Sequence, residues 1–374
     1  MSQTPARVLV CPQEFKGSLS AAEAASAIAR GIRAAWPDAD VTEAPMADGG
    51  PGTAEIVRAA RGGEWVEERC TGPLDEEIEA RFALVDDGRE AVIEAAATVG
   101  LVLVPEEQRD PGRGWSYGLG QQIRFALDRG VERILIGVGG TGTNDGGAGA
   151  ASALGYRLLD VAGDELPSGP LHLERLARID ASGVDGRLSG VDVRVAVDVR
   201  NPLLGPEGAT AVYGPQKGVT PELRPRLEAA LERWAEVVRR DLGVDIASIE
   251  GGGAGGGLAA GLAAACGASV ESGAALVAGE IGLEGLIAAT DLVVTGEGRL
   301  DTQTGYGKAV AHVVGLAAAH ERRCVAVAGS IAAFPSGIEA AEAAASGIVP
   351  AEAMARAAEL VEAAARRLAD DLPF

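Results

Sequence analysis

Polar side chains recur in this sequence where short apolar runs end, and most of them lie in glycine-rich loops. The set combines carboxylates, amides and a few cations: Lys16, Asp48, Asn144, Asp145, Asp198, Asn201, Lys217, Glu297, Arg299, Asp301 and Lys308. In nucleotide enzymes Mg²⁺ takes one or two carboxylates together with phosphate oxygens, and cations offset the charge on the transferring phosphoryl group. The joint pattern therefore indicates Mg-nucleotide phosphoryl transfer, although each acid alone also fits a helix cap or a turn.

The lysines form a set of their own. Of 33 basic residues only three are lysine, and each stands next to a glycine: Lys16 in FKGS, Lys217 in PQKG and Lys308 in YGKA. An ammonium is a compact charge that can follow a phosphoryl oxygen, whereas a guanidinium is a planar fork. We therefore expect the three lysines to share a phosphate pocket. Placement beside glycines by chance is the alternative.

The stretch ILIGVGGTGTNDGGAG, residues 134–149, would organise such a site. Its apolar run predicts a buried strand, glycines follow, and a helix is predicted from Ala148 to Leu154. Backbone N–H groups in such a loop, together with a helix N-terminus, suit an anion such as phosphate. A tight turn whose glycines only supply positive φ is the alternative, and Asn144 and Asp145 favour chemistry.

Other nucleotide-binding motifs are absent or weak. The sequence has no G-x-x-x-x-G-K-[ST] and no protein-kinase loop set. Gly137, Gly139 and Gly142 spell G-x-G-x-x-G after a predicted strand, and Asp160 follows 18 residues later. This formal dinucleotide fingerprint leaves an NAD-dependent oxidoreductase as an alternative, but the spacing is easily met where glycines crowd.

Parallel strands would position these loops. Val8–Pro12 and Asp40–Ala44 are predicted strands, and each leads through a polar loop into a predicted helix. A repeated β-loop-α unit predicts a parallel sheet that holds its ligand at the carboxyl ends of the strands. Lys16 and Asp48 would then share one rim of the sheet.

The pattern changes after this unit. From Trp65 to about Ile93 apolar and polar residues alternate around Gly-Pro and Asp-Asp-Gly turns, which is typical of antiparallel strands. A second domain should therefore begin near residue 70. The remaining predicted elements are strands at 192–197, 292–295 and 324–328 and helices at 116–128, 221–241, 258–266 and 351–369.

The totals narrow the class of protein. With 374 residues, 47% apolar and 23% charged, the sequence predicts a globular protein of about two domains. A net charge of −21 repels nucleic acid and anionic membranes, so neither is an expected partner. The four cysteines and three histidines show no metal-ligand or disulfide spacing. We see no signal peptide and no membrane-spanning apolar run, and expect a soluble cytoplasmic protein.

Several of these stretches together resemble one family, the bacterial type I glycerate kinases. The matching stretches are FKGSLSA, PMADGG, IGVGGTGTNDGGAG, DVRNPL, GPQKG, GAGGGL and VVTGEGRLD, in family order between residues 8 and 350. The resemblance implies that ATP and Mg²⁺ are used to phosphorylate D-glycerate to 2-phosphoglycerate. It also implies a two-domain α/β fold with the active site in the cleft. A Rossmann-like parallel α/β domain would comprise residues 1–70 and 285–374, and an inserted mixed α/β domain residues 71–284.

The sequence departs from the family's usual reading at three loops. CPQEFKGS replaces APDSFKGS, so Gln13 and Glu14 stand for Asp and Ser. Pro51 stands for Glu in PMADGGPGT, and the stretch 114–122 lacks a usual Thr and Glu. These changes alter charge and hydrogen bonding where the substrate is expected. The alternative function is therefore a divergent paralogue that binds nucleotide or a related hydroxy acid, with altered substrate or weak activity.

The motifs and the resemblance together give the expected site. Expected catalytic residues are Asp48, Asp145, Asp198 and Lys217; substrate-binding residues are Lys16, Ser18, Asn144, Arg299 and Asp301; ATP-binding residues are Gly139, Gly140, Thr141, Glu297 and Lys308; Mg²⁺ ligands are Asp198 and Asp301. Individual roles stay open. Arg299 or Lys16 would hold the substrate carboxylate, and Lys217 and Lys308 would bind the phosphates. Asp198 or Asp301 would bind Mg²⁺, and Asp48 or Asp145 would orient or deprotonate the hydroxyl. Expected partners are a small hydroxy acid and ATP, and a homodimer is one expected assembly.

Overall fold

The computed structural model describes residues 5–301, 309–333 and 336–373. The chain forms two compact units: unit 1 comprises Met1–Asp48 and Ala274–Phe374, and unit 2 comprises Gly49–Gly273. The predicted domain boundaries, 70/71 and 284/285, fall inside β3 (Glu64–Thr71) and α10 (Leu283–Ala288). Those boundaries, and the expected active-site cleft, stay predictions.

Unit 1 is built on a five-stranded sheet whose neighbouring strands all run parallel in the described residues. Val8 pairs with Leu292 on one side and with Val41 on the other. These short runs of buried aliphatic residues are typical of strands covered on both faces. The strands, in spatial order, are β13 (Ala341–Ala343), β12 (Arg323–Ile331), β11 (Leu292–Leu300), β1 (Arg7–Val10) and β2 (Asp40–Glu43). The predicted Rossmann-like parallel α/β class is confirmed.

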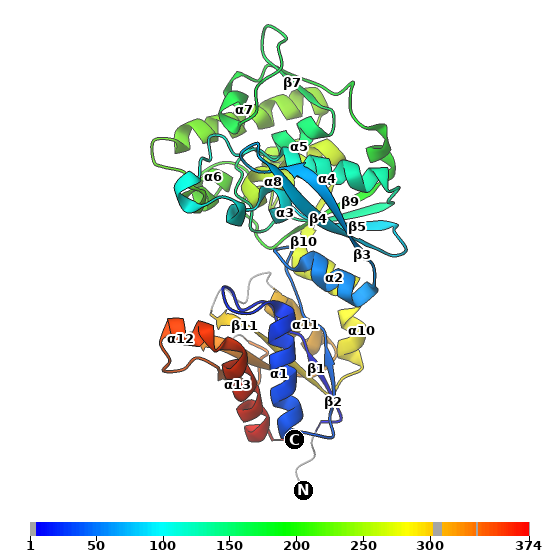
Figure 1. Cartoon of the computed structure of the whole chain (residues 1–374), viewed down its shortest axis with the longest axis vertical. Helices are drawn as coiled ribbons and strands as arrows, with labels where there is room; N and C mark the ends of the chain where they lie inside the picture. The colour runs from blue at the N-terminus through cyan, green and yellow to red at the C-terminus, as the bar shows by residue number, and fades with distance from the viewer. Residues whose placement is uncertain (1–4, 302–308, 334–335, 374) are drawn as a thin grey trace. The chain divides into compact units, whose positions relative to one another are not determined.

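Two helices from opposite ends of the chain cover one face of this sheet (Figure 1). They are α1 (Ala21–Ala35) and α13 (Ala357–Asp371), which pack against each other. Gly31 permits this close packing, because a Cβ at that position would meet the carbonyl oxygen of Glu362. The other helices of the unit are α9 (Gly273–Glu280), α10, α11 (Ala309–Ala319) and α12 (Pro350–Ala355).

Local sequence sets the helix ends in this unit. The Ser20 hydroxyl accepts a hydrogen bond from the Glu23 N–H (3.2 Å), and the Glu23 carboxylate accepts one from the Ser20 N–H (2.8 Å). This capping box satisfies two backbone donors at the start of α1. The last predicted helix, 351–369, is wrong as a single element. It is interrupted at Arg356, whose backbone (φ −113°, ψ 19°) is not helical, and this separates α12 from α13.

Unit 2 contains a six-stranded mixed sheet, as the sequence predicted. Its strands are, in spatial order, β10 (Ser269–Ser272), β9 (Asp192–Val197), β6 (Arg133–Gly137), β5 (Glu90–Glu94), β4 (Glu77–Val85) and β3. The first four run parallel, whereas β5, β4 and β3 form an antiparallel meander that confirms the alternation between Trp65 and Ile93. A separate two-stranded sheet pairs β7 (Arg157–Leu159) with β8 (Arg178–Asp180).

Helices complete unit 2 around one large apolar core. They are α2 (Thr53–Arg61), α3 (Ala96–Val99), α4 (Tyr117–Asp128), α5 (Ala148–Ala153), α6 (Ala209–Tyr213), α7 (Arg224–Leu242) and α8 (Ala254–Cys266). Short 3₁₀ turns lie at 101–103, 106–108, 170–175, 186–190, 215–217 and 246–248. The Trp234 side chain of α7 is buried, and its N–H donates to the carbonyl of Gly146 (2.9 Å). In the described part of the chain, every helix is too short or too polar to cross a membrane.

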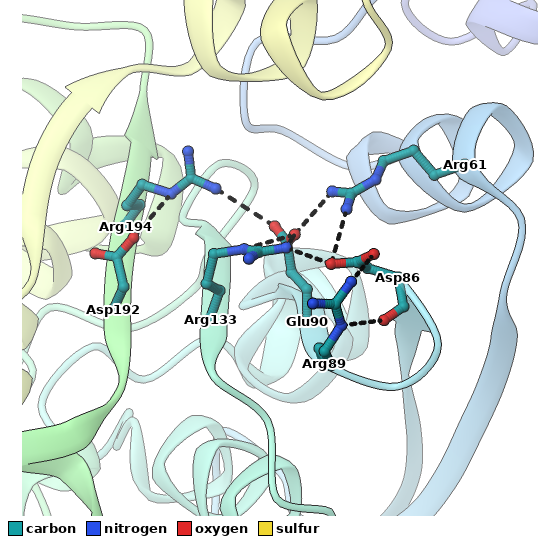
Figure 2. A network of polar contacts seen from close by, with 7 residues as sticks. All are labelled: Arg61, Asp86, Arg89, Glu90, Arg133, Asp192 and Arg194. Atoms are coloured by element: carbon teal, nitrogen blue, oxygen red, sulfur yellow. Dashed lines mark hydrogen bonds and ion pairs between the residues drawn. The ribbon is translucent and has the colours of Figure 1, made fainter.

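A cluster of opposite charges ties together the amino ends of the central strands of unit 2 (Figure 2). The Glu90 side chain, at the start of β5, is fully buried. It accepts hydrogen bonds from Arg61 (2.7 Å), Arg133 (3.0 Å) and Arg194 (3.4 Å). The Arg133 guanidinium also contacts Asp86 and holds the pKa of that carboxyl below its ordinary value. The cluster lies at the opposite ends of β5 and β6 from the glycine-rich loop.

Candidate active site

A polar pocket lies at the carboxyl ends of the parallel strands of unit 1. It has a volume of about 290 Å³ and is formed by the loops after β1 and β2 and by the end of β11. This is where ligands bind in parallel α/β sheets. The lining residues are Gln13, Glu14, Lys16, Asp48, Glu297, Gly298, Arg299 and Asp301. Five predicted site residues are therefore brought together, including Lys16 and Asp48 on one rim.

The first loop reaches the pocket because it continues the pairing of β1 with β11. The Gln13 N–H donates to the Gly296 carbonyl oxygen (2.8 Å). Phe15 is buried beneath the loop and bridges to Leu19. The Ser18 hydroxyl donates to the Phe15 carbonyl oxygen (2.9 Å), and Ser18 is not among the residues that line this pocket. Its predicted contact with substrate stays a prediction.

The charges in this pocket are unevenly distributed. Four carboxylates line it beside two cations, Lys16 and Arg299. The Arg299 guanidinium lies 3.6 Å from Asp301 Oδ2, a pair whose arginine side chain is 67% exposed and therefore only weakly stabilising. Burial raises the pKa of Glu14, with Lys16 opposing and Asp48 reinforcing the effect. An anionic ligand would thus bind most favourably here together with a cation.

Asp48 is held by a neutral partner. Its Oδ2 accepts a hydrogen bond of 2.5 Å from Nε2 of Gln13, whose side chain is only 6% exposed. Within the described part of the chain, no other side chain donates a hydrogen bond to Asp48. Gln13 and Glu14 were absent from the expected site. The sequence signal that could have placed Gln13 and Glu14 in the expected site is that both differ from the residues expected in this loop from the family resemblance.

The glycine-rich loop of unit 2 follows β6, as predicted, and its outermost residues reach solvent. Gly140 (φ 72°) is exposed and Gly139 is partly exposed, whereas Thr141 is buried and bridges to Gly100. The Gly139 N–H donates to the Gly49 carbonyl oxygen (3.2 Å). The accessible part of the loop is therefore its turn at residues 139–140.

Asp145 has no solvent exposure and binds both its own loop and Ser116, at the start of α4. Its carboxylate accepts hydrogen bonds from the Ser116 hydroxyl (2.6 Å) and from the N–H groups of Ser116, Gly147 and Gly149. Burial raises the pKa of Asp145, and these hydrogen bonds oppose that shift. The N-terminus of α5, expected to face an anion, is thus already occupied by a carboxylate of the same chain. The reason is that the N–H groups of Gly147 and Gly149 turn toward the Asp145 carboxylate that precedes them.

Lys217 lies beneath the same loop and is 2% exposed. Its ammonium donates to the carbonyl oxygen of Thr143 (2.7 Å), and burial lowers its pKa to about 8 against an opposing interaction with Asp145. Gly256 makes room for this contact, because a Cβ there would meet the Thr143 carbonyl oxygen. Asn144 is equally buried and donates to Thr210 Oγ1 (3.0 Å). Lys217 and Asn144 therefore stabilise the glycine-rich loop from its buried side.

The remaining expected residues divide between the units. Asp198 follows β9 in unit 2 and is partly exposed. Burial, reinforced by the charge of Asp198, raises the pKa of Tyr213 to about 12. Lys308 lies outside the described residues. Lys16 belongs to unit 1 and Lys217 to unit 2, so the shared pocket of the three lysines stays a prediction.

Two further expectations concern cofactors. Asp160 follows β7 in the separate two-stranded sheet, not a strand of the sheet that contains Gly137, so the dinucleotide fingerprint is not assembled. Among the described residues no three His, Cys, Asp or Glu side chains are grouped closely enough to hold a metal by themselves. Mg²⁺ usually takes one or two carboxylates and completes its shell with water and phosphate. Asp301 in the acidic pocket fits that donor chemistry.

A parallel α/β sheet with an acid-lined pocket at the carboxyl ends of its strands is typical of α/β enzymes that bind small polar ligands. Comparison with known proteins then gives the family: a model described as the glycerate kinase family matches residues 8–372, so the chain belongs to that family. The predicted resemblance and the predicted class of enzyme, a kinase, are confirmed.

Individual relatives agree with this assignment. The chain is 44% identical to a glycerate kinase of Bacillus subtilis strain 168, over 97% of both chains. It is 42% identical to a glycerate 2-kinase of Escherichia coli strain K12, over 87% of this chain and 85% of the other. A crystal structure from Salmonella typhimurium LT2, described as a candidate glycerate kinase 2, matches with a TM-score of 0.86 and 46% identity over 97% of both chains.

Proposed function

We propose that this protein transfers the terminal phosphoryl group of ATP to D-glycerate and forms 2-phosphoglycerate. The observation that carries the proposal is the pocket at the carboxyl ends of the unit 1 strands, where five predicted site residues meet. Membership of the glycerate kinase family supports the reaction class. The name of the Escherichia coli relative supports phosphorylation at the 2-hydroxyl.

The pocket supplies groups for each part of the substrate. Lys16 or Arg299 binds the glycerate carboxylate, because both cations line the pocket. Asp48 accepts the proton of the 2-hydroxyl as that oxygen attacks the terminal phosphorus and the bond to the ADP oxygen breaks. Asp301, or alternatively Asp198, would hold Mg²⁺, which would neutralise charge on the phosphates.

Unit 2 contributes the nucleotide loop in this proposal. The turn at Gly139 and Gly140 is accessible. Since the Gly139 N–H donates to Gly49, the backbone group offered to a phosphate oxygen is the Gly140 N–H. Asp145 and Lys217 hold this loop from inside, and Asn144 fixes it to Thr210. Contacts of Thr141, Glu297 and Lys308 with ATP remain part of the proposal.

A coupled assay for ADP tests the reaction directly. We expect ADP formation that requires D-glycerate, ATP and Mg²⁺ together, and ³¹P and ¹H NMR should identify 2-phosphoglycerate. L-glycerate and D-lactate serve as matched acceptors, because they differ in configuration and in the 3-hydroxyl. Absence of ADP with D-glycerate, or formation of 3-phosphoglycerate alone, would contradict the proposal.

A divergent paralogue is the second candidate, and one observation favours it. Two of the positions that depart from the family's reading, Gln13 and Glu14, line the pocket itself. If they change selectivity, a screen of short hydroxy acids should show turnover with another acceptor, or ATP binding in calorimetry without turnover. The predicted homodimer and cytoplasmic location also remain proposals, and analytical ultracentrifugation tests the first.

A further inference from the structure

The contact between Gln13 and Asp48 gives the pocket an unusual feature. A fully ionised carboxylate that removes a proton must keep one oxygen directed at the substrate. In this pocket a buried amide occupies Oδ2 of Asp48 at 2.5 Å. The Gln13 backbone is itself fixed, since its N–H donates to Gly296 of the sheet (2.8 Å). The amide is therefore a rigid donor to one chosen oxygen.

The charged groups around Gln13 and Asp48 make a neutral side chain at position 13 more favourable than a carboxylate. Glu14, Lys16, Glu297, Arg299 and Asp301 line the same pocket. Glu14 already adds a half-buried carboxylate close enough to Asp48 for the two to repel. A further carboxylate at position 13 would face Asp48 at hydrogen-bond distance, where two carboxylates cannot both ionise readily. Gln13 supplies a donor without adding that charge.

We infer that Gln13 is a positioning residue that directs Oδ1 of Asp48 toward the substrate hydroxyl without placing a second negative charge beside Oδ2. This inference rests on the proposed function of Asp48 as the proton acceptor. A carboxylate side chain at this position would have no N–H to donate when ionised, so the contact depends on the amide.

The test compares two variants of similar size across pH 5 to 9. Gln13→Met removes the donor without adding charge, and we expect kcat for D-glycerate to fall about tenfold or more at every pH, with KM for ATP unchanged. Gln13→Glu keeps the shape and adds a carboxyl group that shares one proton with Asp48 at low pH. Its O–H then replaces the amide donor, so kcat should be near normal at the acidic end and fall as pH rises.

Two outcomes overturn the inference. One is a Gln13→Glu profile that runs parallel to that of the unsubstituted protein, which would show a merely structural role. The other is a Gln13→Met variant with full kcat.

Thermal unfolding provides a readout that needs no activity. Sharing a proton raises a carboxyl pKa in the folded protein, so Gln13→Glu should lose stability relative to Gln13→Met as pH rises from 5 to 8. If the unsubstituted protein forms no ADP with D-glycerate, the proposed function fails, and this unfolding comparison still decides whether the pair couples.

Discussion

The ammonium nitrogen of Lys217 lies 2.7 Å from the carbonyl oxygen of Thr143, inside unit 2, in a side chain that is 2% exposed. A lysine that is expected to neutralise phosphate is thus engaged with the backbone of the glycine-rich loop. Its contact spans 74 residues of sequence, and the loop it holds contains the fully buried Asn144 and Asp145. The position of the loop therefore depends on a buried charge.

We expect the unsubstituted protein to gain free energy of unfolding relative to Lys217→Met as pH rises. Burial lowers the pKa of Lys217 to about 8 from an ordinary value of 10.5, so between these values the unfolded chain binds more protons. The contribution of Lys217 to stability then rises with pH by on the order of 2–3 kcal/mol and is missing from Lys217→Met, while the other titrating groups act equally in both proteins. Urea unfolding of both proteins from pH 7 to 10.5 measures this. A constant difference would show that Lys217 is not a buried charge.

Gly256→Ala should destabilise unit 2 far more than its backbone angle alone requires. Gly256 (φ 76°) leaves no room for a Cβ beside the Thr143 carbonyl oxygen. Gly243 has nearly the same φ (75°), and a Cβ there meets nothing within 4 Å. Gly243→Ala should therefore cost about 1–2 kcal/mol, and Gly256→Ala about 3 kcal/mol or more. Equal losses in urea unfolding would contradict the clash.

Glu90→Gln should be among the most destabilising single changes in unit 2. The residue is fully buried and forms ion pairs with three arginines, Arg61 at 2.7 Å, Arg133 at 3.0 Å and Arg194 at 3.4 Å (Figure 2). Removing one partner of a fully buried ion pair costs about 3–5 kcal/mol. Because these arginine side chains are 22–32% exposed, we expect a loss of about 2–3 kcal/mol.

The matched control is Glu77→Gln, because the Arg69–Glu77 pair is 73% and 72% exposed and should contribute under about 1 kcal/mol. Below the unfolding transition, kcat of Glu90→Gln should stay within about twofold, since the cluster lies at the opposite strand ends from the glycine-rich loop. A large loss of kcat without a loss of stability would contradict this reading.

Much of the fold could be predicted because its cause is local. The runs at Val8–Val10 and Leu292–Val294 form buried parallel strands, and the alternation between Trp65 and Ile93 forms the antiparallel meander. These patterns depend on hydrophobic periodicity, which the sequence carries directly. The break at Arg356 was missed because the composition stays helical on both sides of it.

The candidate site could be predicted as a set of loops but not as a set of contacts. Glycine spacing located the loop at 134–149, and strand ends located Lys16 and Asp48. Sequence spacing carries no information on the partner across the fold, such as Asp48 for Gln13, 35 residues away. Asp145 illustrates the same limit, since the hydroxyl and the N–H of Ser116, 29 residues away, donate hydrogen bonds to its carboxylate. Its catalytic role stays a prediction.

Lys16→Met should weaken glycerate binding more than it slows the chemical step. Lys16 lines the pocket and forms no ion pair with the described residues, whereas Arg299 shares its charge with Asp301 at 3.6 Å. The Lys16 ammonium is therefore the cation most available to the substrate carboxylate. A charge-assisted hydrogen bond contributes about 1.5–3 kcal/mol, so KM for D-glycerate should rise about 10- to 100-fold while kcat changes little.

Arg30→Met is the matched control, because it removes one positive charge from an exposed pair with Glu362 in the same unit and should leave KM unchanged. An unchanged KM in Lys16→Met, with a raised KM in Arg299→Met, would transfer the carboxylate-binding role to Arg299.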